Sequence, residues 1–284
     1  MIDANNLSII YSADHSDYRK KKFGATLLEQ CLHSISSIRH NWSKDVPIYL
    51  THTRVIPHTI LKKLERLNVK AIQNDRYAFP EFPLANKMNF ATVPTETSYI
   101  LFLDCDTVVH KPLVIDSSRD ILVGYDALIG LSQETFLSLF HQFNIPWPGG
   151  NFYESPVYEY YFRNKKDIFP AWNSGVFFIK THLRQEFASV WHKIFRETYE
   201  KFKEEPWSFY IEQVSFILSI FALHLDYQIL PKGYNFICTP RANHLQFWDQ
   251  NRIYIEHYAG DSSEPINFVQ GEFDPLNFEE GIHT

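Results

Sequence analysis

The segment SYILFLDCDTVV, residues 98–109, places two carboxylates, Asp104 and Asp106, directly after a run of apolar residues. Two ionised carboxylates a few ångströms apart repel each other, so one normally keeps its proton unless both share a cation. In an extended chain residues two positions apart point the same way, and both carboxylates can then face one ion. Such oxygen ligands favour Mg²⁺ or Mn²⁺. The segment therefore predicts a metal site at a strand end, with two solvated aspartates in a turn as the simpler alternative.

Strand and helix patterns alternate before these two aspartates. Short β-rich runs alternate with stretches whose apolar residues recur at helical spacing; the strands are 7–11, 47–51, 69–73 and 99–103, and the helices 23–39 and 60–67. This order predicts an α/β fold, a doubly wound layer with a mostly parallel central sheet, flanking helices and ligands at the carboxyl ends of the strands. The run at 99–103 is the most apolar, as is typical of a central strand.

The second half of the chain continues this pattern around one unusual segment. Further strands are predicted at 120–125, 172–180 and 253–258, and helices at 183–199 and 211–221. Residues 141–172 instead combine Pro and Gly with many aromatic residues. Loops of that length are usually functional or disordered, and so many aromatic side chains disfavour disorder. We expect a substrate-side excursion, or else an oligomer surface, within a single domain that covers residues 1–284.

Composition and charge argue against several classes of protein. The net charge of −6 disfavours a nucleic-acid-binding protein, which needs a broad basic face. The cysteines Cys31, Cys105 and Cys238 are widely spaced and fit neither a disulfide framework nor a zinc site, so a reducing cytosol is the simplest setting. The N-terminus lacks the features of a signal peptide, and the longest apolar run, 214–225, is too short for a bilayer. We therefore expect a cytoplasmic protein without a transmembrane segment.

Two enzyme classes place Asp-x-Asp after an apolar run. In haloacid-dehalogenase-like phosphatases the first aspartate, here Asp104, attacks phosphorus, and the segment GDSSE at 260–264 loosely resembles a later acidic motif of that class. In nucleotide-sugar glycosyltransferases of the GT-A fold the two aspartates bind Mn²⁺ beside a diphosphate. The position of the motif separates these classes, because the phosphatase motif usually forms the first strand. Here about a hundred residues of α/β pattern precede it, which favours the glycosyltransferase.

The chain resembles the family 8 glycosyltransferases, the relatives of glycogenin and of bacterial lipopolysaccharide galactosyl- and glucosyltransferases. Six segments carry this resemblance in the family's order over most of the chain: YSADHSDY (11–18), NKMNFA (86–91), LFLDCDTVV (101–109), WNSGVFFIK (172–180), EQVSF (212–216) and HYAG (257–260). Each segment is weak by itself, since Asn-Ser-Gly is common and a lone Glu-Gln pair in a helix is usually solvated. Their agreement in order makes a chance match improbable.

The resemblance implies a role for each matching residue. Asp104, Asp106 and His257 would bind Mn²⁺ (or Mg²⁺), which would stabilise the charge of the diphosphate as the glycosidic bond breaks. Glu212 and Gln213 would lie near the anomeric carbon and stabilise its positive charge. Donor binding would fall to residues of several segments, which are Ala13, Asp14 and Tyr18 for the base, Lys87, Asp104 and Asn173 for sugar or phosphate, and Gly260. The aromatic excursion would then lie on the acceptor side.

One departure from the family puts donor affinity in doubt. The family commonly has a Lys-Pro pair after its His-x-x-Gly, and its lysine binds the diphosphate, whereas this chain has Glu264 followed by Pro265. The expectation is nevertheless a glycosyltransferase that moves a sugar from a nucleotide diphosphate, UDP-linked, to a glycan, lipid-linked or protein acceptor, with retention implied by the family alone. The alternatives are the phosphatase and a member that binds nucleotide sugar or glycan without turnover.

Overall fold

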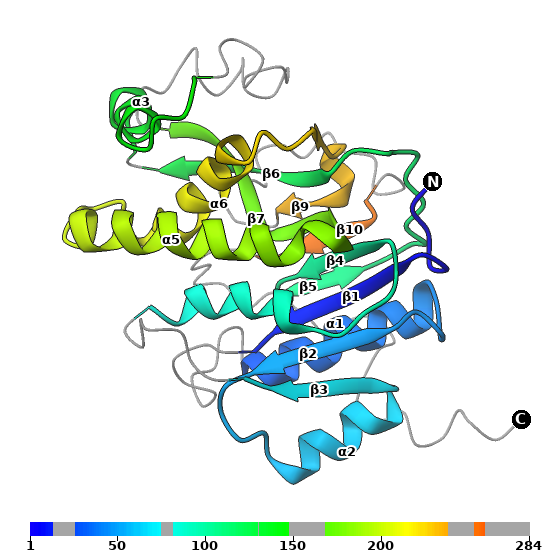
Figure 1. Cartoon of the computed structure of the whole chain (residues 1–284). Coiled ribbons are helices and arrows are strands. Elements are labelled where there is room, and N and C mark those ends of the chain that lie inside the picture. Colours follow the sequence, from blue (N-terminus) through cyan, green and yellow to red (C-terminus); the bar gives the residue numbers. More distant parts are fainter. Residues whose placement is uncertain (14–25, 75–81, 130, 148–167, 238–252, 259–284) are drawn as a thin grey trace, which may run out of the picture.

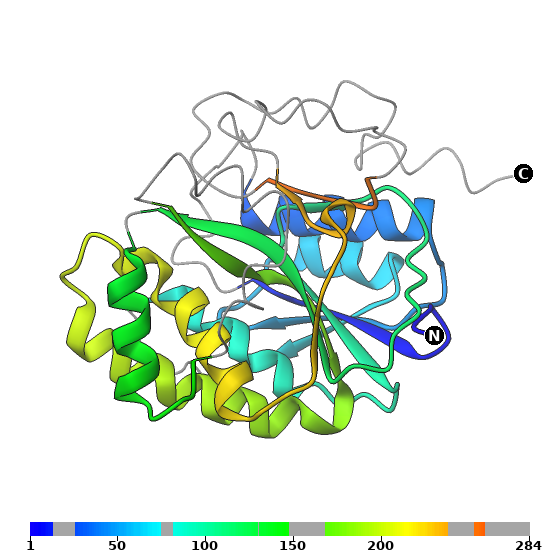
Figure 2. The same cartoon turned by 90° about the horizontal axis from the view of Figure 1, so that it is seen from above.

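The protein is a three-layer α/β structure in which helices cover both faces of a central sheet (Figures 1 and 2). The computed structural model describes residues 1–13, 26–74, 82–129, 131–147, 168–237 and 253–258. Helices α1 (Leu27–Asn41) and α2 (His58–Arg66) lie on one face, and the 3₁₀ segment η1 (Pro83–Thr92) with helices α5 (Arg184–Phe202) and α6 (Ile211–Ala222) lies on the other. This confirms the predicted fold class.

The central sheet has seven strands in the order β3-β2-β1-β4-β7-β6-β8. Strands β1 (Leu7–Ser12), β2 (Ile48–His52), β3 (Val69–Gln73) and β4 (Tyr99–Leu103) are mutually parallel neighbours. Strand β7 (Ile168–Lys180) runs antiparallel to both of its neighbours, β4 and β6 (Ile121–Ile129), and the short β8 (Tyr227–Ile229) is parallel to β6. The strand predicted to be central is therefore the middle strand of the sheet.

The pairing of β6 with β7 is interrupted at the point where β7 carries Asn-Ser-Gly. Val123 pairs with Phe177, but the next residue of β6, Gly124, pairs with Asn173. Residues 174–176 of β7 therefore have no partner on β6, while Val176 still pairs with Leu103 at the end of β4. Irregularities of this kind redirect side chains and are frequent beside active sites. The shift places Ser174 and Gly175 at the carboxyl end of β4.

A second, three-stranded sheet with the order β5-β10-β9 lies beside the central one. It contains β5 (Thr107–Val109), β9 (Phe236–Ile237) and β10 (Ile255–His257), and β10 runs antiparallel to β5 and parallel to β9. Strand β5 follows the two aspartates directly, so the pairing of β10 with β5 brings a segment from late in the chain next to them. This sheet was not predicted as such, because only β10 lies within a predicted strand (253–258), and β5 and β9 are too short for a periodic pattern.

Helix α1 binds β5 through polar side chains. Ser34 Oγ lies 2.9 Å from Thr107 Oγ1, Ser37 Oγ accepts a hydrogen bond from Val109 N (2.9 Å), and Asn41 Nδ2 donates to Val109 O (2.8 Å). These bonds satisfy backbone groups of β5 that would otherwise be buried without partners. The helix begins at a capping box in which Thr26 and Glu29 bind each other's backbone N–H. The predicted helix at 23–39 thus starts later, at residue 27.

Most other predicted elements have the expected type, with bounds that differ by a few residues. Lys87 lies in the 3₁₀ helix η1. The core fills the space on both sides of the sheet, with Phe102 and Phe177 on the η1, α5 and α6 side. Sequence patterns missed several short elements: helix α3 (Gln133–Gln142), strands β5, β8 and β9, and the 3₁₀ turns η3 (Thr181–Leu183), η4 (Ser208–Tyr210) and η5 (Lys232–Tyr234).

Candidate active site

Asp104, Asp106 and His257 meet at the carboxyl end of β4. Each offers one ligand atom, and these atoms all lie within 4.8 Å of one another. His257 Nε2 lies 3.4 Å from Asp106 Oδ1 and 3.7 Å from Asp104 Oδ2. His257 is almost fully buried, whereas both carboxylates are partly exposed. The three residues therefore form a cluster that is closed on the imidazole side and that solvent reaches from the carboxylate side.

The aspartates reach this arrangement by a route other than the predicted one. We expected an extended strand with both carboxylates on one side, but β4 ends at Leu103 and residues 105 and 106 form a turn. Thr107 Oγ1 closes the turn by donating to Asp104 O at 2.8 Å. Cys105 is buried between the aspartates and donates to the carbonyl of Ser12 at 3.4 Å. The turn, and not the pleat of a strand, directs the two carboxylates to one point.

The backbone at Gly175 lies so close to this cluster that a side chain at this position would collide with it. A Cβ atom at position 175 would lie 2.2 Å from Asp104 Oδ2 and 2.8 Å from His257 Cε1. The glycine of Asn-Ser-Gly is therefore required by close approach of the backbone to two of the three candidate ligands. Carboxylate and imidazole donors that converge on one point, with room preserved by a glycine, fit a divalent ion such as Mn²⁺ or Mg²⁺.

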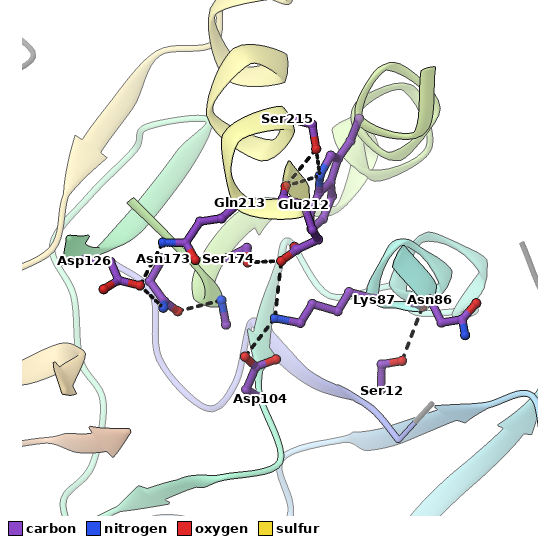
Figure 3. A network of polar contacts seen from close by, with 12 residues as sticks. Ser12, Asn86, Lys87, Asp104, Asp126, Asn173, Ser174, Glu212, Gln213 and Ser215 are labelled. Carbon is purple, nitrogen blue, oxygen red and sulfur yellow. Dashed lines mark hydrogen bonds and ion pairs between the residues drawn. The ribbon is translucent and has the colours of Figure 1, made fainter. Parts of the chain in front are cut away.

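Lys87 is a buried cation between two carboxylates. Its Nζ atom donates to Asp104 Oδ2 at 2.8 Å and lies 3.9 Å from Glu212 Oε2 (Figure 3). Burial by itself would lower the pKa of Lys87, but the charges of Asp104 and Glu212 outweigh burial and raise the pKa above its ordinary value. Lys87 therefore stays charged at every physiological pH. It neutralises part of the negative charge that the aspartates and Glu212 bring together.

Glu212 lies in the first turn of α6 and is 3% exposed. Its Oε2 atom accepts from Ser174 Oγ at 2.9 Å, and its Oε1 atom has no hydrogen-bond partner among the described residues. Burial raises the pKa of Glu212 to about 7, although Lys87 and the bond from Ser174 act in the opposite direction. An unpaired buried carboxylate oxygen is costly, and such groups are found where a ligand completes them.

A second cluster forms around Asp126, a residue that sequence analysis did not select. Asp126 Oδ2 accepts from Asn173 Nδ2 and from Gln213 Nε2, both at 2.8 Å (Figure 3). Asn173 Oδ1 in turn accepts from Gly175 N at 2.6 Å. Because a carboxylate only accepts hydrogen bonds, Asp126 fixes the orientation of both amides, whose nitrogen atoms face it. The predicted strand at 120–125 ended one residue before Asp126, whereas β6 continues to Ile129, so no sequence pattern indicated this carboxylate.

The remaining predicted site residues contribute less to the described part of the molecule. Ala13 is buried, and its N–H donates to Thr51 O at 3.0 Å. Asp14, Tyr18, Gly260 and Glu264 lie outside the described residues. Base binding by the segment 11–18 and the effect of Glu264 therefore stay predictions.

The aromatic excursion at 141–172 is described only at its two ends. Residues 141 and 142 belong to α3, residues 168–172 belong to β7, and 148–167 lie outside the described residues. Trp147 packs edge-on against Phe136 and Phe140, with ring centroids 6.3 and 5.0 Å away. Trp172 is fully buried. Trp172 is thus part of the core and Trp147 packs against it, while a role of the excursion on the acceptor side stays a prediction.

Comparison with known proteins identifies the class to which this fold and site belong. Residues 24–224 match the sequence profile of the Rhodobacterales glycosyltransferase domain, which is more than half of the chain. The chain therefore belongs to this family and is a glycosyltransferase. No curated protein matches the sequence. Asn235 and His257 lie beyond the matched residues.

Solved structures share the fold at low sequence identity. The galactosyltransferase LgtC, crystallised with donor and acceptor sugar analogues, has a TM-score of 0.54 and 13% identity over 89% of this chain and 87% of that one. The glycosyltransferase GlyE of Streptococcus pneumoniae has a TM-score of 0.51 and 16% identity over 89% of this chain and 54% of GlyE. Mouse xyloside xylosyltransferase 1 has a TM-score of 0.50 and 13% identity over 92% of this chain and 99% of that one. The fold is thus the GT-A fold and resembles that of LgtC-like family 8 enzymes. None of the described helices is long and apolar enough to cross a membrane.

Proposed function

We propose that this glycosyltransferase moves a sugar from a nucleotide diphosphate, UDP-linked, to an acceptor hydroxyl with the help of Mn²⁺ (or Mg²⁺). The observation that carries the proposal is the convergence of Asp104, Asp106 and His257, since about 150 residues separate the imidazole from the carboxylates and the fold still brings their ligand atoms within 4.8 Å. These residues would hold the ion. When bound, the ion would supply Lewis-acid stabilisation of the negative charge on the diphosphate.

The chain's own residues would act on the other charges of the reaction. Lys87 holds Asp104 Oδ2 at 2.8 Å and adds positive charge on the side where a diphosphate departs. Glu212 and Gln213, both buried, present oxygen atoms that stabilise the positive charge which develops at the anomeric carbon. A solved structure of LgtC carries a glutamine-to-glutamate substitution in its active site, which supports an active-site role for a glutamine such as Gln213.

The proposal also covers the acceptor and the stereochemistry. Retention of anomeric configuration follows from the likeness to family 8 enzymes. The acceptor would be a glycan, a lipid-linked sugar or a protein. The family match and the position of Asp104 after the fourth strand of a GT-A sheet favour sugar transfer over the phosphatase reaction.

A thermal-shift titration with UDP in the presence and absence of Mn²⁺ tests the proposal. A ligand that binds only the folded state raises the melting temperature. We expect UDP to stabilise the wild type only with Mn²⁺, and Asp106→Asn to lose this effect. Asp116→Asn, the same change at an exposed position, is the control that keeps it. Equal stabilisation of wild type and Asp106→Asn would contradict the metal site. An aspartyl-phosphate formed at Asp104 from a phosphate ester would favour the phosphatase instead.

A further inference from the structure

Asn235 lies directly behind the imidazole of His257. Asn235 Oδ1 and His257 Nδ1 are 2.9 Å apart, and the two residues are 2% and 1% exposed. The other ring nitrogen, Nε2, faces Asp106 and Asp104. Asn235 joins η5 to β9, and β9 pairs in parallel with β10, the strand that carries His257. The asparagine thus touches the side of the ring that points away from the carboxylates.

The chemistry of the amide determines the state of the ring. An amide oxygen only accepts hydrogen bonds, so Nδ1 must carry the proton when it faces Asn235 Oδ1. A neutral imidazole has one N–H, and the lone pair then lies on Nε2, which points toward the two carboxylates. An amide turned the other way would donate to Nδ1 and place the proton on Nε2, where the ring could donate to a carboxylate and could not bind an ion. Only the first arrangement prepares the ring as a ligand.

The surroundings of Asn235 hold its side chain in place. A Cβ atom added at Gly124 would lie 2.8 Å from both Cβ and Nδ2 of Asn235. The amide therefore packs directly against the backbone of β6, next to the register shift. Two residues before Asn235, Gly233 O accepts from Tyr254 N at 2.8 Å, which ties the segment before Asn235 to the one before β10. The side chain has little freedom to move away from the imidazole.

We infer that Asn235 is a positioning residue of the metal centre, which keeps His257 in the tautomer with its Nε2 lone pair directed between Asp104 and Asp106. This inference rests on the proposed metal site. Groups that accept the second N–H of a metal-binding histidine orient its ring and typically change metal affinity by about 10- to 100-fold. A neutral amide does this without adding a negative charge to a cluster that already contains Asp104, Asp106 and Glu212.

The tautomer can be measured without metal, by two-bond ¹H–¹⁵N NMR of histidine-labelled protein at pH 8. His257 is assigned by the resonance lost in His257→Gln. We expect wild type to show protonated Nδ1 and unprotonated Nε2. Mn²⁺ affinity is then measured by electron paramagnetic resonance of the free ion, for wild type, Asn235→Leu, Asn235→Asp and Tyr234→Phe. The last variant removes the hydroxyl that donates to Val114 O and alters the same segment without touching His257.

Asn235→Leu removes the acceptor at similar volume, and we expect it to weaken Mn²⁺ binding about 10- to 100-fold and to populate the Nε2–H tautomer. Asn235→Asp keeps an acceptor and should keep the wild-type tautomer and at least the wild-type affinity, as should Tyr234→Phe. An Nε2–H tautomer in wild type would overturn the inference, and so would an affinity of Asn235→Leu within twofold of wild type. A wild type with the expected tautomer that binds neither Mn²⁺ nor Mg²⁺ would overturn the metal site, and this inference with it.

Discussion

Replacement of Gly175 by alanine should destroy metal binding while the protein still folds. The added methyl group would lie 2.2 Å from Asp104 Oδ2, where an ordinary contact begins at 3.4 Å. One of the two groups must therefore move by about 1 Å, whereas the ligand distances of a metal site tolerate about 0.2 Å. The methyl group would also lie 2.8 Å from His257 Cε1, so moving Asp104 alone does not remove the conflict.

The expected magnitudes follow from these distances. Loss of a group that merely supports a ligand costs about 10- to 100-fold in affinity, and here two ligands themselves are displaced, so we expect Mn²⁺ affinity to fall by about 100-fold or more. Overpacking of a filled site costs about 1–3 kcal/mol of stability. The hydrogen bond from Lys87 to Asp104 Oδ2 should weaken as well, because it involves the same oxygen.

Calorimetric titration of Mn²⁺ and urea unfolding in EDTA measure the two effects separately. Val176→Ala is the matched control, since Val176 is the next residue of β7 and is fully buried. Loss of its two methyl groups should cost about 2 kcal/mol, at about 0.8 kcal/mol for each carbon plus a cavity term, and should leave Mn²⁺ affinity unchanged. If Gly175→Ala binds Mn²⁺ within threefold of wild type, the claim that this backbone position fixes the ligands is wrong.

Three further changes test the charges of the site. Burial raises the pKa of Glu212 from 4.5 to about 7, so between these pH values the folded protein holds a proton that the unfolded chain releases, and stability falls as pH rises. The free energy of unfolding of Glu212→Gln, measured in urea, should match that of wild type near pH 4.5 and exceed it by on the order of 3 kcal/mol at pH 8. A difference that does not change with pH would contradict the buried charge. Lys87→Met leaves two carboxylates without their cation and should lower the free energy of unfolding by about 3–5 kcal/mol at pH 7 in EDTA, whereas a loss below 1 kcal/mol would mean that the pair is solvated. Asp126→Asn should reduce the transfer rate about 10- to 100-fold, since two charge-assisted hydrogen bonds are weakened, and leave UDP affinity unchanged; an equal loss of both would make Asp126 a structural residue.

Several residues of the candidate site could be predicted from one apolar run and from the order of segments that are weak individually. Asp104 and Asp106 come after the most apolar run of the chain, and Lys87, Glu212 and His257 belong to segments that match a known family in order. The turn that carries Asp104 and Asp106 could not be predicted from the alternating side-chain directions of a strand. It depends on the hydroxyl of Thr107, which closes a turn onto Asp104 O. Thr is enriched in strands, so its residue type does not indicate this turn.

The residues that were missed act through contacts that are distant in the chain. Asp126 and Asn235 are single polar residues in apolar surroundings, and nothing in their local sequence shows that one binds Gln213 and the other His257. The serines of α1 were missed for a similar reason. A polar helix position normally predicts exposure, but Ser34 and Ser37 are buried because they bind β5. Sequence periodicity records burial of apolar groups and not buried polar pairs.

The order of the site residues along the chain has a consequence for synthesis on the ribosome. Lys87, Asp104 and Glu212 all belong to the part of the chain that emerges first, and their ion pairs need nothing beyond residue 212. Asn235 and His257 emerge afterwards. The nascent chain can therefore neutralise its acidic cluster with its own lysine before a metal ligand set exists. We therefore expect the yield of folded protein to be independent of the supply of the proposed metal ion, whereas sugar transfer should depend on it.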